Sequence, residues 1–221
     1  MAEMGLGYGS EFQLMRFLGH HRDYLNDLIS KVINQSDAIE WKDYPFEKKK
    51  KSGDGEWKGI DCFGEDFPFK KEWSSFWPSK GNAMNWDGIF RVGKTWYFVE
   101  AKANADEAHQ HCSAENENSI KMIDNAFAKT QKWLGICPKQ SWRKSDCYQL
   151  ANRLAFLYFC NVVCKIDARC LYISFINGYY RKDVESIKDW KTIWDEEYKT
   201  LGLNESNLKS LVYHIYPDCM Q

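Results

Sequence analysis

NWDGIFRVGKTWYFVEAKANADE, residues 85–107, consists of two runs of aromatic and branched residues separated by glycine and lysine, which is the pattern of a β-hairpin. Three charged residues lie near the ends of the two predicted strands: Asp87, Glu100 and Lys102. Acids and lysines are uncommon in strands that become buried, so each of the three needs a partner or a purpose. The hairpin is therefore the first place to look for a functional site.

The turn of this hairpin determines which residues face each other. Residues 93–94 begin with glycine, as a type II′ turn requires, and this turn pairs Val92 with Thr95. Counting back along both strands then pairs Asp87 with Glu100. Directly opposed residues have β-carbons about 4.5–5.5 Å apart, and two like charges at that distance repel each other.

One face of the hairpin is expected to collect the charged side chains. Alternation along the strand puts Glu100 and Lys102 on the face of Trp96 and Phe98, and Asp87 shares that face as a cross-strand partner. A divalent cation that bridges the two carboxylates would offset their repulsion, and Lys102, at a strand end near solvent, would hold a water or a phosphate beside it. The structural alternative is that Asp87 is a turn residue and that Glu100 and Lys102 form a surface ion pair.

The composition is that of a globular protein that forms a single domain, residues 1–221, with 44% hydrophobic and 28% charged residues and no Pro/Gly/Ser-rich linker. The sequence contains no apolar run of about 18 residues and no secretory signal, so we expect a cytoplasmic protein with no membrane partner. The eight cysteines lack paired spacing and are expected to be reduced. Because the formal net charge is −1, any contact with nucleic acid must come from a local basic patch.

Hydrophobic periodicity outlines the other elements. A capping box at Ser10 and Gln13, followed by apolar spacings of three and four, predicts one long helix over residues 10–34. Residues 35–80 show little periodicity and predict loops, with one strand near 57–63. After the hairpin we expect helices at 119–134, 146–165 and 184–201 and strands at 168–176 and 211–216. This order predicts an α/β sheet covered by helices.

Two short motifs of the hairpin, Trp86-Asp87-Gly88 and Val99-Glu100-Ala101-Lys102, resemble the signature of the PD-(D/E)XK, or restriction-endonuclease-like, nuclease superfamily. Trp86 stands where the family name has proline. The resemblance implies a restriction-endonuclease-like mixed central sheet of four to five strands flanked by helices. It also implies that Asp87, Glu100 and the backbone carbonyl of Ala101 bind Mg²⁺, or Mn²⁺ as a substitute. By the same resemblance, Lys102 orients or activates the water that hydrolyses a phosphodiester.

Glu11 is a candidate for a supporting role. It lies in the first turn of the first predicted helix, in line with Met15 and Leu18 on an apolar stripe. By the resemblance, an acid on this helix would complete the metal site. Otherwise Glu11 is simply an acid favoured at a helix N-terminus by the helix dipole.

Gln149 and Arg153 are two more candidates for support. With Asn152 they form a polar strip within about one turn of the helix expected at 146–165. By the resemblance, this helix leans over the site and helps to bind phosphate or the lysine. The alternative is that Gln149 caps its helix and Arg153 forms a surface ion pair.

These observations together predict a metal-dependent nuclease that hydrolyses phosphodiester bonds, of DNA rather than RNA. The alternative is a catalytically silent protein of the same fold that binds nucleic acid or a partner protein. A homodimer is compatible with either prediction. His109, His111 and Cys112 could begin a zinc site, but no second pair of ligands is spaced to complete it.

Overall fold

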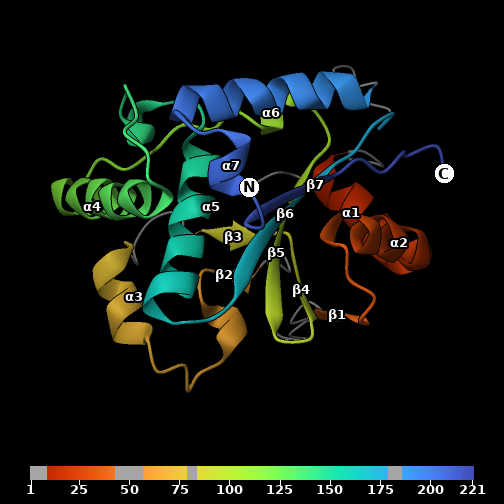
Figure 1. The fold of residues 1–221 in the computed structure, drawn as a ribbon, viewed down its shortest axis with the longest axis horizontal. Helices are drawn as coiled ribbons and strands as arrows, with labels where there is room; N and C mark the ends of the chain where they lie inside the picture. Colours follow the sequence, from red (N-terminus) through yellow and green to blue (C-terminus); the bar gives the residue numbers. More distant parts are fainter. Residues whose placement is uncertain (1–8, 43–56, 79–83, 179–185) are drawn as a thin grey trace.

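A mixed sheet forms the centre of the protein, whose computed structural model describes residues 9–42, 57–78, 84–178 and 186–221. Its five strands are β1 (Ile39–Lys42), β4 (Gly88–Val92), β5 (Thr95–Lys102), β6 (Ala168–Ser174) and β7 (Val212–Ile215), in the order β1-β4-β5-β6-β7. β1, β4 and β5 pair antiparallel, whereas β6 runs parallel to β5 and β7 runs parallel to β6. The predicted α/β class, a mixed sheet flanked by helices, is confirmed (Figure 1).

Helices cover the sheet in two layers. The first layer is α1 (Ser10–His20) and α2 (Arg22–Ile33), and the second is α3 (Lys70–Phe76), α4 (Glu117–Leu134), α5 (Tyr148–Tyr158) and α6 (Ile187–Leu201). The short α7 (Glu205–Leu208) precedes β7, and a small second sheet joins β2 (Trp57–Lys58) to β3 (Asn85–Trp86). Each layer of helices therefore has its own apolar core against one face of the same sheet.

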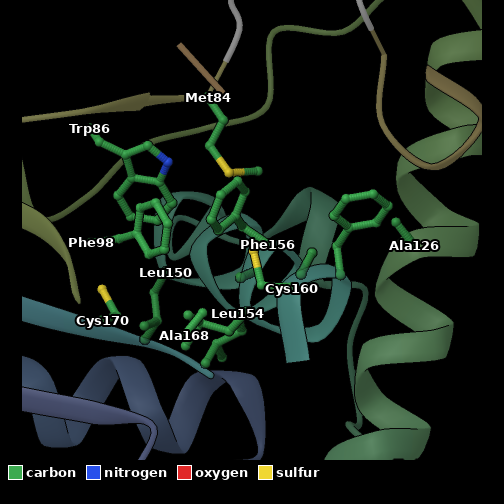
Figure 2. Close-up of a cluster of buried hydrophobic side chains, with 14 of the residues drawn as sticks. Met84, Trp86, Phe98, Ala126, Leu150, Leu154, Phe156, Cys160, Ala168 and Cys170 are labelled. Atoms are coloured by element: carbon green, nitrogen blue, oxygen red, sulfur yellow. The ribbon is translucent and has the colours of Figure 1, made fainter. Parts of the chain in front are cut away.

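β5 is the central strand, and its two faces belong to the two cores. Val99 and Ala101 face the layer of α1 and α2, while Phe98 faces the layer of α5. On the α5 side, Phe156 packs against Phe98 and Trp86, with ring centroids 4.7 and 4.9 Å apart (Figure 2). Aromatic burial of this kind dominates core energetics, so α5 is held firmly over β5.

The turn of the hairpin forms as predicted, but its regular pairing stops before Asp87. Val92 pairs with Thr95, and Gly93 has the positive φ of 57° that the first position of the turn requires. The paired register runs back to Gly88 opposite Val99, and the Asp87 amide also donates to the Val99 carbonyl at 3.1 Å. Asp87 and Gly88 thus both lie opposite Val99, as in a β-bulge. A bulge changes the direction of the side chains at that position, here the side chain of Asp87.

The single helix predicted over residues 10–34 is wrong, because the chain breaks at His21 into α1 and α2. The Arg22 side chain donates to the Leu18 carbonyl at 2.9 Å, which satisfies one of the acceptors exposed at the break. The predicted cap is wrong as well, since Gly9 occupies the N-cap position and no side chain caps the helix.

The stripe that aligned Glu11 with Met15 and Leu18 is also wrong. Met15 is exposed, and the buried apolar residues of α1 are Leu14 and Phe17. Because of the break at His21, α1 and α2 each turn their own apolar face toward the sheet. A single hydrophobic pattern with a period of 3.6 residues therefore cannot describe both helices.

Most of the other predicted elements are confirmed. The structure contains the expected helices α4, α5 and α6 and the strands β6 and β7, and a π turn over Phe159–Val163 extends α5. Residues 184–185 of the predicted third helix lie outside the described residues. The predictions missed β1 and α3, which belong to a region without clear periodicity. The eight cysteines all lie within the described residues, and no two of them are joined in a disulfide.

Phe156→Ala should lower the free energy of unfolding by about 3–5 kcal/mol, because it leaves a cavity between Trp86 and Phe98 that the sheet cannot fill. Urea denaturation measures the change. Val32→Ala, at an exposed position of α2, is the control and should change stability by at most about 0.5 kcal/mol. Equal effects of the two substitutions would contradict the packing of α5 described above.

Candidate functional site

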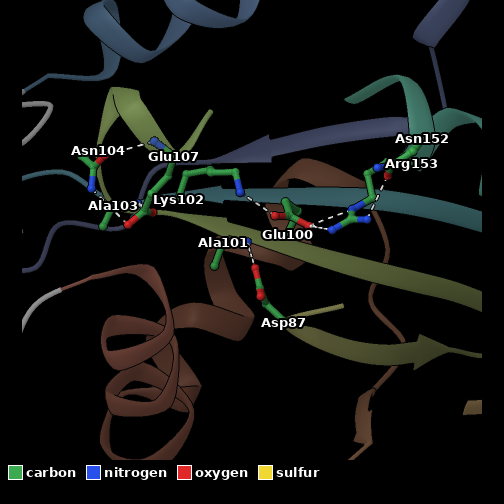
Figure 3. Close-up of polar contacts among 9 residues, drawn as sticks. All are labelled: Asp87, Glu100, Ala101, Lys102, Ala103, Asn104, Glu107, Asn152 and Arg153. Atoms are coloured by element: carbon green, nitrogen blue, oxygen red, sulfur yellow. Dashed lines mark hydrogen bonds and ion pairs between the residues drawn. The ribbon is translucent and has the colours of Figure 1, made fainter. Parts of the chain in front are cut away.

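The charged residues of the hairpin meet polar residues of other elements near the C-terminal end of β5 (Figure 3). Glu100 and Lys102 come from β5 itself, Asp87 from the bulge before β4, and Arg153 from α5. Open α/β sheets bind ligands outside the carboxyl ends of their parallel strands, so this is the expected place for a site.

Glu100 is a buried carboxylate that is paired with two cations. Its side chain is only 3% exposed. Arg153 donates from Nε and Nη2 to Oε2 at 2.8 and 2.6 Å, and Lys102 donates from Nζ to Oε1 at 2.5 Å. Burial alone would raise the pKa of Glu100, but the charges and hydrogen bonds of Arg153 and Lys102 outweigh it and hold the pKa below its ordinary value. Glu100 is therefore ionised at neutral pH.

Arg153 is held from three directions. Besides its two bonds to Glu100, it donates from Nη1 to the Asn152 side chain at 2.9 Å, and its guanidinium lies 4.6 Å from the centre of the Trp86 ring. The planar guanidinium suits both a forked contact with a carboxylate and stacking on an aromatic face. Arg153 is buried, so the alternative that placed it in a surface ion pair is wrong.

Asp87 turns its side chain toward the edge of β5. Its Oδ2 accepts a hydrogen bond from the Ala101 amide at 2.7 Å. The amide and the carbonyl of one strand residue point to the same side, so the Ala101 carbonyl also faces the Asp87 side of β5. The Asp87 carboxylate and the Ala101 backbone thus lie side by side, and Ala101 directly follows Glu100 in the sequence.

Lys102 is buried, with 4% of its side chain exposed, so its predicted position near solvent is wrong. The ion pair with Glu100 exists, but it is internal rather than on the surface. The repulsion expected between Asp87 and Glu100 is already offset in this structure, because Lys102 and Arg153 balance two negative charges with two positive ones.

The two remaining candidates lie on different sides of the sheet. Glu11 is half-buried in the first turn of α1, whose apolar residues pack on the face opposite Phe98. Gln149 is buried in the first turn of α5, one turn before Arg153. No side chain caps α5, whose N-cap residue is Cys147, so the alternative role of Gln149 as a cap is wrong.

Glu197 is a fifth titratable residue of this region, and it is not among the predicted site residues. It lies on the buried face of α6, 1% exposed, and among the described residues neither of its carboxyl oxygens has a hydrogen-bond partner. Burial is the main reason that its pKa is raised to about 8; Lys102 lowers this pKa and Glu100 raises it further. One feature of the sequence could have identified Glu197: it is an acid that lies within the apolar stripe of Trp190, Trp194 and Leu201.

The histidines predicted as possible zinc ligands have other neighbours. His109 Nδ1 lies 3.8 Å from Glu197, and His111 Nδ1 lies 3.4 Å from Asp146. Within the described ranges, no group of three or more His, Cys, Asp or Glu side chains is arranged to hold a metal ion. A Mg²⁺ ion needs fewer protein ligands than this, since it usually keeps several waters and takes one or two carboxylates.

Comparison with known proteins gives no relative: no family model, no curated protein and no solved structure matches the chain. The resemblance to the PD-(D/E)XK superfamily therefore rests on the hairpin residues. None of the helices in the described ranges is both long enough and apolar enough to cross a membrane.

Arg153→Met should destabilise the protein by about 3–5 kcal/mol, because it leaves Glu100 buried with one cation in place of two. The double variant Glu100→Gln/Arg153→Met should lose clearly less unfolding free energy than the two single variants lose together. Urea denaturation of the parent, the two single variants and the double variant measures these losses. Arg143→Met removes a partly exposed ion pair with Asp124 and should cost at most about 1 kcal/mol. Additive losses in the cycle would show that Glu100 and Arg153 do not interact.

Glu197→Gln should make the protein more stable than its parent at neutral pH, with a gain that grows as pH rises. Between about pH 4.5 and about pH 8 the folded parent keeps a proton that the unfolded chain has lost, so its stability falls as pH rises through that range. The variant has no such titration, and the difference should reach about 3 kcal/mol at pH 7.

Urea denaturation at pH 5, 6, 7 and 8 tests this expectation. Glu196→Gln, at the exposed neighbouring position of α6, is the matched control and should follow the parent at every pH. A constant difference between Glu197→Gln and the parent over the four pH values would show that Glu197 is not protonated in the folded state.

Proposed function

We propose that this protein hydrolyses phosphodiester bonds of nucleic acid, with DNA as the preferred substrate, in a reaction that depends on Mg²⁺. The observation that carries the proposal is the arrangement at the end of β5. Asp87 is hydrogen-bonded to the Ala101 amide, and Ala101 lies between Glu100 and Lys102, whose side chains are in contact. This supports the role that the resemblance to the PD-(D/E)XK superfamily gives these residues.

The oxygen atoms of this region are of the kind that Mg²⁺ prefers. Asp87, Glu100 and the Ala101 carbonyl would hold the ion, and Mn²⁺ would serve as a substitute. When bound, such an ion polarises a phosphoryl oxygen and lowers the pKa of a coordinated water. Lys102 and Arg153 already engage both oxygens of Glu100, so a bound ion would either share the carboxylate with them or displace one of them.

Lys102 and Arg153 would then turn from Glu100 to the substrate. The Lys102 ammonium would orient the attacking water, and the Arg153 guanidinium suits two oxygens of one phosphate. Both side chains are at most 6% exposed, so the proposal requires that the covering residues move before nucleic acid can reach them. Such an opening is common in enzymes whose sites close over the substrate.

A second function, that of a silent protein that binds nucleic acid or a partner protein, is favoured by one specific observation. Glu100, Lys102 and Arg153 form a closed set of buried hydrogen bonds without any added ion. A charge network of this kind can serve the fold alone, since a buried carboxylate must be paired. Metal binding and cleavage separate the two functions.

Mn²⁺ should stabilise the parent protein by about 2.7 kcal/mol at a hundredfold excess over Kd, and Asp87→Asn should lose most of that gain. The asparagine keeps an acceptor for the Ala101 amide, so the comparison removes the charge and spares the hydrogen bond. Asp124→Asn, at an exposed carboxylate of α4, is the control and should respond to Mn²⁺ as the parent does. Thermal melts with and without Mn²⁺ provide the measurement.

Cleavage assays on single- and double-stranded DNA and RNA complete the test. The parent should cut with Mg²⁺ or Mn²⁺, and Lys102→Met, which keeps much of the apolar stem, should not cut, provided that its far-UV circular dichroism matches the parent. A parent that neither responds to Mn²⁺ nor cleaves any of these substrates would support the silent alternative.

A further inference from the structure

Lys42, the last residue of β1, places its ammonium group between two indole rings. Its Nζ lies 5.2 Å from the centre of the Trp57 ring and 5.4 Å from the centre of the Trp96 ring, and it donates to the Cys62 carbonyl at 2.6 Å. In the part of the chain that the structure describes, no carboxylate forms an ion pair with Lys42. The rings and the carbonyl attract this positive charge, but they do not neutralise it.

Arg91 is a second cation beside the same rings. It is paired with Trp96 in the register of β4 and β5, and its guanidinium lies 5.3 Å from the centre of the Trp96 ring. Arg91 donates from Nη2 to the Gly93 carbonyl at 2.9 Å, whereas its buried Nε has no hydrogen-bond partner among the described residues. Trp96 therefore has two cations at its ring, Lys42 and Arg91.

Two exposed acids lie near these cations without pairing with them. Glu40 is the cross-strand neighbour of Arg91 in the register of β1 and β4, and Asp61 lies one residue before the carbonyl that Lys42 binds. Within the described ranges, neither acid forms an ion pair with Lys42 or Arg91. The positive charge of these two side chains thus remains available to an anionic ligand.

The rings of this region are not enclosed in the core. Trp57, Phe63 and Trp96 are half-buried and pack against the edge of the core on the α5 side of the sheet. The Phe63 ring meets the Trp96 ring edge-on, with centroids 5.0 Å apart, and so holds it in place. We call Lys42, Trp57, Arg91 and Trp96 together the aromatic-cation cluster.

The aromatic-cation cluster lies beside the candidate site. Trp57 is the cross-strand partner of Trp86 in the sheet of β2 and β3, and Asp87 directly follows Trp86. Since consecutive Cα atoms are about 3.8 Å apart and cross-strand pairs about 4.5–5.5 Å, the Cα atoms of Trp57 and Asp87 lie within about 9 Å of each other. Trp96 shares one face of β5 with Glu100, about 13 Å further along the strand. A strand of nucleic acid with one phosphate at Asp87 would bring its neighbouring nucleotides to the cluster.

We propose that the aromatic-cation cluster binds a single strand of nucleic acid. Unpaired bases would stack on Trp57 and Trp96, and phosphates would lie next to Lys42 and Arg91. Aromatic rings combined with cations are typical of surfaces that bind single strands without reading their sequence, because every base has a face that can stack. In a duplex those faces are already stacked on one another, so the two indoles favour the unpaired strand.

The charge of the whole protein requires a local site of this kind. The formal net charge is −1, so no general positive field attracts a nucleic acid. Binding must come from cations that are gathered in one place and not neutralised by acids. Lys42 and Arg91 meet both conditions within the described part of the chain.

The identity of the ligand rests on the proposed function, since nucleic acid is the substrate proposed for the end of β5. The cluster also narrows that function. Bases that stack on Trp57 and Trp96 must be unpaired near the bond that is cut, so the substrate class is a single strand or an unpaired end or loop of a duplex. Binding needs neither metal nor cleavage, and it can be measured separately.

Fluorescence anisotropy in EDTA, with a short labelled thymidine oligonucleotide and a thymidine–adenosine duplex of the same length, tests the cluster. The parent should bind the single strand about tenfold more tightly than the duplex. Trp96→Leu should weaken binding of the single strand by about tenfold, because one stacking ring is lost. Trp133→Leu, at a half-buried position of α4, is the matched control and should bind as the parent does.

Lys42→Met keeps the apolar stem of the side chain and removes its charge. The logarithm of the binding constant falls linearly with the logarithm of the salt concentration, and one phosphate contact of a single strand contributes about 0.7 to this slope. Lys42→Met should therefore make the slope shallower by about 0.7. A lysine that only supports the Cys62 carbonyl would leave the slope unchanged. Lys31→Met, at an exposed ion pair of α2, is the control for the loss of one charge.

Three results would overturn the proposal. The first is a parent that binds the duplex as tightly as the single strand, or more tightly, since contacts to the phosphate backbone alone would explain it. The second is a Trp96→Leu variant with parental far-UV circular dichroism and parental affinity. The third is a parental salt slope in Lys42→Met. If Trp96→Leu does not fold, the other two measurements still decide.

Cleavage assays with Mg²⁺ on the same proteins separate this proposal from the proposed function. A parent that prefers the single strand in EDTA but cuts no nucleic acid would support the cluster and count against hydrolysis. A parent that cuts, together with Trp96→Leu and Lys42→Met variants that bind and cut as the parent does, would support hydrolysis and overturn the cluster.

Discussion

The buried carboxylate of Glu100 is the constraint on which the arrangement of this protein depends. A charge in that position must be paired. One partner, Lys102, lies on the same strand, and the other, Arg153, lies on a helix and is 53 residues away in the sequence. Arg153 reaches Glu100 only if α5 lies directly over β5. The apolar contacts of Phe156 with Phe98 and Trp86 place α5 in that position, so core packing and charge pairing require the same geometry.

The sequence predicted best those features that depend on neighbouring residues. The turn after Val92 follows from glycine at its first position, and the helices α4 and α6 follow from long periodic runs. The break at His21 and the strand β1 could not be predicted, because they depend on contacts made after the chain folds. The bulge at Asp87 belongs to the same class, since β3 leaves the hairpin there to pair with β2.

The candidate site also combines residues that the sequence could predict with contacts that it could not. Asp87, Glu100 and Lys102 were found because charged residues are unusual in such a strand pair. The pairing of Glu100 with Arg153, and the approach of Glu197 from α6, depend on how distant helices pack on the ends of β5 and β6. Glu197 also belongs to one of several acid-any-lysine patterns in the chain, so its spacing alone carried no information.

The two buried glutamates of this region show how position alone can divide the roles of chemically identical side chains. Glu100 lies between two cations, and its pKa is lowered, so it is an anion at neutral pH. Glu197 lies beyond hydrogen-bonding distance of any cation among the described residues, and burial raises its pKa to about 8, so it retains its proton near neutrality. Sites that combine one ionised and one protonated carboxyl can hold positive charge and exchange protons at the same pH. Lys102 is in direct contact with Glu100, and its charge also lowers the pKa of Glu197, so one cation acts on both glutamates to different extents.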